Sequence, residues 1–167
     1  MPVLPDVLQP GLDVVFVGTA ASRRSAEDGT PYAGPGNAFW RILHEAGFTP
    51  RQLDPEDYET LPKYGIGLTN MAPDSIGNDD VLTPDDFDPD GVRAKIEQAA
   101  PRTLAFVGKR AAQEFHRRKT LAYGRQPEPV GMTEVFVLPS TSGAARRYWD
   151  ASYWHALAAY LKHINST

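Results

Sequence analysis

The sequence predicts an α/β fold, a three-layer α/β/α sandwich around a short, mostly parallel sheet. Short, continuous apolar runs alternate with longer amphipathic segments along the chain, which is typical of strands buried on both faces and of the helices that cover them. Fifteen prolines and 14 glycines keep these elements short. A chain of 167 residues can bury one sizeable core but is too short for two ordinary domains. Residues 1–167 are therefore expected to form one domain.

Four segments have the apolar composition of buried strands, residues 13–17, 64–69, 103–107 and 134–138. The first ends at Gly18, the third at Gly108 and the fourth at Pro139. The second is a weaker strand prediction because Gly65 and Gly67 interrupt it.

Four further segments have the spacing of amphipathic helices, residues 37–46, 90–100, 109–118 and about 150–164. In the first of them Phe39, Ile42 and Leu43 fall on one face, and Gly47 is a natural C-terminal stop. Pro101 ends the second. Strands and helices thus alternate along the chain, and the crossovers between strands favour a parallel sheet.

Composition excludes several classes of protein. The chain has no cysteine, which rules out disulfides, thiolate zinc sites, iron–sulfur clusters and cysteine nucleophiles. No apolar run approaches the roughly 18 residues of a membrane helix, and the N-terminus has no basic and apolar regions of a signal peptide. We expect a cytoplasmic protein with no membrane partner, no metal and no cofactor.

Charge is unevenly distributed along the chain. The formal net charge of −4 argues against a nucleic-acid partner, but residues 74–90 hold seven of the 21 acidic residues and no Lys or Arg. The remaining sequence has 14 acidic and 17 basic residues. Basic groups occur at residues 23–24, 109–110, 117–119 and 146–147. They either form a basic face opposite an acidic loop or are scattered, solvated charges.

Function is sought in the loops that follow the strands, because parallel α/β sheets bind ligands at the carboxyl ends of their strands. The first loop, residues 18–22, consists of small residues that let a ligand approach the backbone. It matches neither the dinucleotide pattern nor the P-loop pattern, so a nicotinamide cofactor or a nucleoside triphosphate is not expected. The alternative is a tight turn without a ligand.

Two side chains in such loops have the chemistry to hold a nucleobase. Tyr32 lies in a loop rich in Pro and Gly, where its ring could stack on a base or anchor the loop on the core. Asn70 ends the second predicted strand. Its amide offers a donor and an acceptor to the O4 and N3–H edge of a pyrimidine dione, unless it only closes a turn.

The loop after the fourth strand combines hydroxyls, Ser140, Thr141 and Ser142, with Arg146 and Arg147. Such groups can position phosphates, or the loop is simply polar. The four histidines all fall on predicted helices without the spacing of a metal site, and no Ser/His/Asp arrangement can be ordered from the sequence.

Six blocks, in this order and spacing, resemble the mismatch-specific uracil-DNA glycosylases, relatives of thymine-DNA glycosylase in the uracil-DNA glycosylase superfamily. They are residues 10–18, 31–40, 45–49, 65–70, 105–109 and 137–143. The family fold is a parallel sheet between helices. The family flips a damaged nucleotide out of the duplex and hydrolyses the bond between base and deoxyribose, which needs donors for the departing base and water for the oxocarbenium-like sugar.

The resemblance assigns roles to residues of this chain. Tyr32 matches the aromatic side chain that stacks on the flipped base. Backbone groups near Thr19 and Tyr32 match those that bind it, and we count Gly18, Ala20, Asn37 and Asn70 with them. The candidate DNA contacts, including the loop that inserts into the duplex, are Ser22, Lys109, Ser140, Thr141, Ser142, Gly143, Ala144, Arg146 and Arg147.

Two positions depart from the family pattern. The family has a water-positioning Asn two residues after Gly18, where this chain has Ala20. Asn70 is the first candidate to replace it and Asp74, as a water-orienting carboxylate, is the second. Ala144 stands where the family has an apolar wedge, so the gap left by a flipped base would be filled by one of the arginines that follow it, or poorly.

The leading hypothesis is a monomeric, monofunctional DNA glycosylase that excises uracil from DNA in mismatched and other contexts. One alternative is a non-catalytic module that binds damaged DNA or a nucleobase, motivated by Ala20. Another is a glycosylase for a different deaminated base. A doubly wound domain with an unrelated small ligand also remains open.

Overall fold

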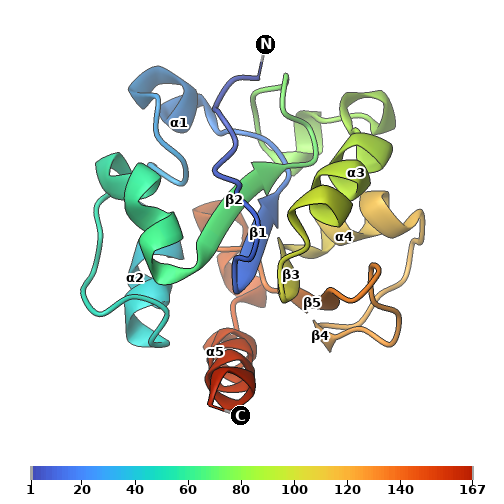
Figure 1. Cartoon of the computed structure of the whole chain (residues 1–167). Coiled ribbons are helices and arrows are strands. Elements are labelled where there is room, and N and C mark those ends of the chain that lie inside the picture. Colours follow the sequence, from blue (N-terminus) through green and yellow to red (C-terminus); the bar gives the residue numbers. More distant parts are fainter. Residues whose placement is uncertain (1, 167) are drawn as a thin grey trace.

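The computed structural model describes residues 2–166, which contain a five-stranded sheet with helices on both faces (Figure 1). The strand order is β2-β1-β3-β5-β4. Neighbouring strands pair in parallel except β4, which runs antiparallel to β5. The strands are β1 (Val14–Gly18), β2 (Ile66–Asn70), β3 (Thr103–Val107), β4 (Gly124–Arg125) and β5 (Glu134–Leu138). The predicted α/β sandwich with a mostly parallel sheet is confirmed.

The helices follow the predicted alternation, and each predicted helix is present with bounds that differ by one or two residues. The α-helices are α1 (Arg23–Asp28), α2 (Phe39–Glu45), α3 (Pro89–Ala99), α4 (Lys109–His116) and α5 (Ala151–Asn165). The 3-10 helices are η1 (Pro55–Tyr64), η2 (Asp79–Val81), η3 (Pro84–Asp86) and η4 (Gly143–Tyr148).

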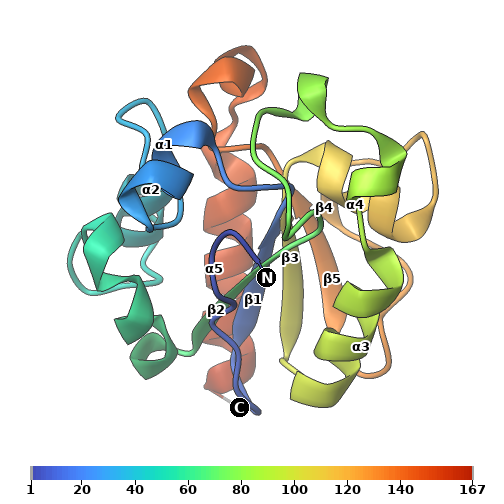
Figure 2. The same ribbon diagram turned by 90° about the horizontal axis from the view of Figure 1, so that it is seen from above.

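The alternating side chains of the strands build two separate cores. In β1, Val14 and Phe16 face the core beneath α2 and α5, whereas Val15 and Val17 face the core beneath α3 and α4. All four side chains are fully buried. Figure 2 shows the two pairs of helices on opposite sides of the sheet. A strand that is apolar at every position, rather than at alternate ones, is what a sheet covered on both faces requires.

Elements absent from the sequence prediction are those without a strong apolar signal. Helix α1 has only Ser25 buried and depends on Ser22, whose side chain accepts a hydrogen bond from the Ser25 amide. Helix η1 buries only Leu61. Strand β4 is two residues long and lies at the edge of the sheet. Local capping and tertiary pairing, rather than hydrophobic periodicity, determine these segments.

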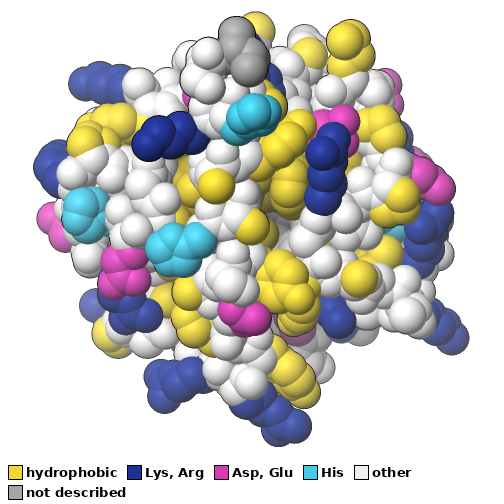
Figure 3. Space-filling model, turned by 90° about the horizontal axis from the view of Figure 1, so that it is seen from below, with side chains coloured by type: hydrophobic (Ala, Val, Ile, Leu, Met, Phe, Trp, Pro, Cys, Tyr) yellow, Lys and Arg dark blue, Asp and Glu magenta, His cyan; other side chains and the backbone are white. Residues whose placement is uncertain are grey.

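Four residues of the predicted basic groups are paired with acidic side chains. Arg24, Arg110, Arg117 and Arg118 each make an ion pair with a nearby carboxylate. Figure 3 shows the molecule from below the view of Figure 1. On this face, Lys and Arg side chains lie mostly around the rim, with Asp and Glu among them. Four of the nine residues in the predicted basic groups are therefore locally neutralised.

None of the helices within residues 2–166 has the length and apolar character of a membrane span.

The aromatic cluster around Phe16 offers a test of the core. Its ring stacks on Trp154 at 5.4 Å and meets Phe39 and Phe48 edge-on, each at 5.5 Å. We expect Phe16→Ala to lower the free energy of unfolding by about 3–5 kcal/mol in urea denaturation, because it leaves a cavity that these rings cannot fill. Met132→Ala, at a side chain that is 99% exposed, should change it by less than about 0.5 kcal/mol. Equal stability of the two variants would contradict this account of the core.

Candidate functional site

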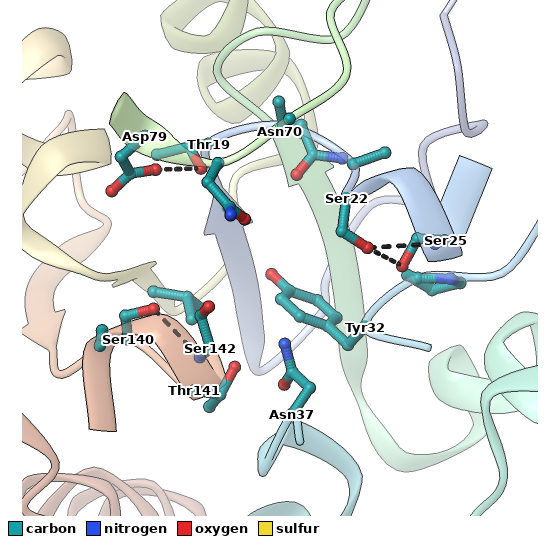
Figure 4. A pocket seen from close by; sticks show the side chains of 18 of the residues that line it. Thr19, Ser22, Ser25, Tyr32, Asn37, Asn70, Asp79, Ser140, Thr141 and Ser142 are labelled. Atoms are coloured by element: carbon teal, nitrogen blue, oxygen red, sulfur yellow. Dashed lines mark hydrogen bonds between the residues drawn. The ribbon is translucent and has the colours of Figure 1, made fainter. Parts of the chain in front are cut away.

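A cavity of about 440 Å³ opens at the carboxyl ends of β1, β2 and β3. Its wall combines the ends of these strands with the loops that follow them (Figure 4). The chemically distinctive lining residues are Thr19, Ser22, Ser25, Tyr32, Asn37, Asn70, Asp79, Asp80, Ser140, Thr141, Ser142 and Tyr148. The cavity therefore lies where parallel sheets bind their ligands.

The inner end of the cavity is built on the pairing of β1 with β2. Their register places Gly18 directly beside Asn70. A Cβ atom on Gly18 would lie 2.7 Å from Oδ1 of Asn70 and 2.8 Å from the hydroxyl of Tyr32. Because residue 18 has no side chain, an amide and a phenol can approach the same point of the backbone. In Figure 4 both side chains extend toward the open space.

Tyr32 is held in an unusual backbone conformation. Its φ of 52° lies in the left-handed region, which costs a residue with a Cβ about 1 kcal/mol or more. Two hydrogen bonds hold the chain on either side: the indole of Trp40 donates to the carbonyl of Pro31 at 3.1 Å, and the amide of Ala33 donates to the hydroxyl of Ser25 at 3.0 Å. The loop therefore fixes the ring before any ligand arrives.

The ring of Tyr32 forms a rigid, uncharged wall. It stacks on Phe39, with centroids 3.9 Å apart and planes inclined by 15°. Burial raises the pKa of the Tyr32 hydroxyl well above its ordinary value. One face of the ring is thus supported by the core, and the residue lines the cavity as a neutral aromatic surface.

Asn37 and Thr141 supply hydrogen-bonding groups on another side of the cavity. Oδ1 of Asn37 accepts from the Phe39 amide at 3.0 Å, which starts α2 and leaves the NH₂ group for the cavity. Thr141 is 2% exposed, and its hydroxyl has no hydrogen-bond partner within residues 2–166. The Ala38 amide donates to the Thr141 carbonyl at 2.9 Å. This bond ties the backbone next to Asn37 to Thr141.

The loop after β5 is folded by its own hydroxyl groups. The hydroxyl of Ser140 accepts from the Ser142 amide, and that of Ser142 accepts from the Ala144 amide, both at 3.2 Å. These bonds turn the chain into η4. Tyr148, at the end of η4, is 59% exposed and also lines the cavity.

Residues 5–162 match the family described as the uracil DNA glycosylase superfamily. The chain belongs to this superfamily. It is also similar to the solution structure of a candidate uracil DNA glycosylase from Methanosarcina acetivorans, with 27% sequence identity and a TM-score of 0.64. That similarity covers 96% of this chain and 97% of the other.

Most site residues predicted for this superfamily member line the cavity, and they come from separate loops. They are Gly18, Thr19, Ala20, Ser22, Tyr32, Asn37, Asn70, Ser140, Thr141, Ser142 and Ala144. Their roles remain predictions.

Five of the predicted residues lie outside the cavity wall. Gly143 and Arg146 flank Gly36 next to it, and Arg147 lies over the Tyr148 ring at 5.1 Å. Nζ of Lys109 lies 4.4 Å from the centroid of the Tyr123 ring. Asp74 is exposed and does not line the cavity, so its carboxylate is separated from the groups gathered there.

Sequence reasoning missed several lining residues of this superfamily member, notably Ser25, Asp79 and Tyr148. Asp79 was counted only as one charge of the acidic segment, and nothing in its spacing distinguishes it from its neighbours. Ser25 lies on a helix that has no apolar periodicity. The position of Tyr148, one residue after an arginine pair in the predicted DNA-contact loop, was the one available signal.

Two further observations limit the choice of site. Within residues 2–166 no group of three or more His, Asp or Glu could hold a metal ion. A second cavity, of about 480 Å³, lies at the amino ends of β1 and β2 against α5. Its carboxylate, Asp13, lies 3.9 Å from Arg102 in an ion pair, and the cavity lies at the opposite end of the strands from the predicted site residues.

Gly18→Ala tests the convergence at the inner end of the cavity. The new methyl group should displace the flexible amide of Asn70 and press on the hydroxyl of the rigid Tyr32 ring, so we expect a folded protein with altered NMR signals of both side chains. Gly34→Ala is the control, because a Cβ there meets nothing within 4 Å. Unchanged Asn70 and Tyr32 signals in Gly18→Ala would show that the two side chains do not meet at this glycine.

Proposed function

We propose that the protein is a DNA glycosylase that flips uracil out of DNA and hydrolyses the bond between the base and deoxyribose. The observation that carries the proposal is the juxtaposition of Tyr32 and Asn70 around Gly18 at the inner end of the cavity. An aromatic face and an amide side by side offer stacking and edge recognition to one planar heterocycle. Membership of the superfamily and the name of the Methanosarcina relative support this reading.

Base recognition follows from the chemistry of the two side chains. Stacking of a base on an aromatic ring is worth about 1–3 kcal/mol, and Tyr32 needs no reorganisation to provide it. The Asn70 amide has both a donor and an acceptor. The donor suits O4 of uracil and the acceptor suits its N3–H, whereas cytosine presents the opposite pattern at this edge.

Departure of the base develops negative charge on its oxygen O2, so catalysis needs donors aimed at that atom. The NH₂ group of Asn37 and the buried, unpartnered hydroxyl of Thr141 are two such donors that line the cavity. A hydroxyl without a partner is costly when buried, and a bound base would satisfy it. These residues are proposed to hold the departing base.

The duplex is proposed to lie against the loop that follows β5. Ser140 and Ser142 line the cavity there, and Arg146, Arg147 and Tyr148 are all exposed. Tyr148 combines a flat, exposed ring with a place on the cavity wall. We propose that it fills the gap left by the flipped base, a role that Ala144 is too small to perform.

The resemblance to mismatch-specific enzymes supports a finer proposal. Such an enzyme depends on weak pairing of the target, whereas direct reading by Asn70 would extend excision to other contexts. We further propose that the protein is monofunctional and acts as a monomer of one domain on DNA in the cytoplasm.

Single-turnover excision tests the activity. Purified protein in excess is incubated with labelled DNA that carries U·G, U·A or single-stranded uracil, and abasic sites are cleaved with alkali. Excision from U·G alone would favour mismatch dependence, and excision from all three would favour direct reading. DNA binding without a released base would instead indicate a binding module or a glycosylase for another lesion, which a panel of deaminated bases separates.

Asn70→Ala and Tyr32→Ala should each lower the single-turnover excision rate by about tenfold or more, since each removes about 1–3 kcal/mol of interaction with the base. Circular dichroism should show that both variants remain folded. Asn165→Ala, at an exposed position on α5, is the control and should keep the wild-type rate. Wild-type rates in both site variants would refute the assignment of the base pocket.

The Arg146→Ala/Arg147→Ala double variant should bind a uracil duplex more weakly and show a shallower dependence of affinity on salt. Removing one arginine that binds a phosphate reduces the slope of log affinity against log salt by about 0.9, which fluorescence anisotropy measures. Arg118→Ala/Arg125→Ala changes the net charge equally, but these arginines are paired with Glu128 and Glu134. Identical slopes in the two double variants would argue against a specific DNA contact.

A further inference from the structure

We infer that Asp79 is the catalytic carboxylate of this site, the group that positions the attacking water and receives its proton. The inference rests on the proposed glycosylase function. It starts from the cavity wall, where Ala20 offers only a methyl group, while Asp79 and Asp80 bring the carboxylates among the lining residues. Hydrolysis at an oxocarbenium-like sugar is assisted by a group that orients water near the reacting carbon, and a carboxylate can do this.

Asp79 is fixed by the first of the strand-end loops. The hydroxyl of Thr19, the residue after β1, donates to Oδ1 of Asp79 at 2.9 Å. Oδ2 has no hydrogen-bond partner within residues 2–166. Figure 4 shows the pair at the edge of the cavity, on the opposite side of the open space from Tyr32. One carboxylate oxygen is thus anchored and the other is free to bind water.

The backbone of Asp79 is clamped from a second direction. The guanidinium of Arg110 donates to the carbonyl of Asp79 at 3.2 Å and to that of Leu82 at 3.3 Å. Arg110 is itself held by Glu114 at 3.1 Å and lies over the Phe87 ring at 4.9 Å. Helix α4 therefore supports η2. As a result, the backbone of Asp79 has a defined position although the residue lies on an exposed acidic segment.

The same segment is tied to the loop after β1 by its backbone. The Ala72 amide donates to the Thr19 carbonyl at 2.7 Å, and the Gly77 amide donates to the Ala21 carbonyl at 2.9 Å. The two loops thus form one rigid edge of the cavity. Asp80 lines the same cavity, but no side chain within residues 2–166 holds its carboxylate, which distinguishes Asp79 from its neighbour.

We place the sugar beside Asp79 from the exposure of the lining residues. Gly18 is buried and the side chains of Tyr32 and Asn70 are half-buried, whereas Asp79 is exposed at the mouth. A base held at the inner end leaves its deoxyribose at the mouth, beside the carboxylate. The negative charge of Asp79 also favours the positive charge that develops on the sugar.

The proposed step is balanced without a cofactor. The C1′–N bond breaks and its electron pair leaves on the base. The water oxygen forms the new bond to C1′, and its proton passes to the Asp79 carboxylate and then to the departed base or to solvent. The products are the free base and an abasic site with a hydroxyl on C1′.

The test compares single-turnover excision from a U·G duplex with binding of the same duplex containing non-cleavable 2′-fluoro-deoxyuridine. Asp79→Asn should lower the excision rate by about 100-fold or more while its Kd stays within a few fold of wild type. Asp79→Glu should recover part of the rate.

Thr19→Val, which loses the anchoring hydroxyl, should be slower than Thr19→Ser. Asp85→Asn, an equal charge change in the same acidic segment outside the cavity wall, should keep the wild-type rate.

The outcomes separate the two proposals. Excision by the wild type together with an active Asp79→Asn would overturn the role of Asp79 and leave the glycosylase standing. An equal loss in Asp80→Asn would also overturn it, because overall charge rather than a held carboxylate would then matter. A loss in Asp74→Asn alone would move the role to that residue. A wild type that excises no base would overturn the proposed function and this inference with it.

Discussion

The parallel pairing of β1 with β2 and β3 is the constraint on which the rest of the molecule depends. Strand β1 lies between them and is buried over its whole length. Its alternate side chains hold the two helical layers together, and its last residue, Gly18, forms the inner end of the cavity. A one-residue slip would exchange the two cores and would also separate Gly18 from Asn70. Stability and the geometry of the site therefore depend on the same register.

The site is preorganised mainly by groups that do not face the ligand. Ser25 and Trp40 fix the loop of Tyr32, and Arg110 fixes the backbone of Asp79. The groups that line the cavity are thereby placed with little freedom left to lose on binding. This arrangement explains how a cavity made from separate loops keeps a defined shape without a disulfide to connect them.

The fold was more predictable from the sequence than the site. The continuous apolar runs and the amphipathic spacing are one-dimensional signals of burial, and they identified β1, β2, β3 and β5 with the helices that cover them. Asn70 could be singled out because it ends a strand, and Tyr32 because it is an aromatic residue in a loop rich in Pro and Gly. Asp79 could not, because its role depends on a hydrogen bond to Thr19, 60 residues away in sequence. The same limitation applies to Asp74, which has the same chemistry and a similar sequence context but lies outside the cavity wall.

The uneven charge around the cavity mouth affects how water enters the cavity and how a released base leaves it. Asp79 and Asp80 border one side of the opening, while the loop that leads to Arg146 and Arg147 borders another. DNA that binds the two arginines is repelled by the two carboxylates. It therefore covers only part of this opening. The uncovered part stays in contact with bulk water. In the proposed complex, fresh water can therefore enter there, and a released base can leave, while the duplex is still held.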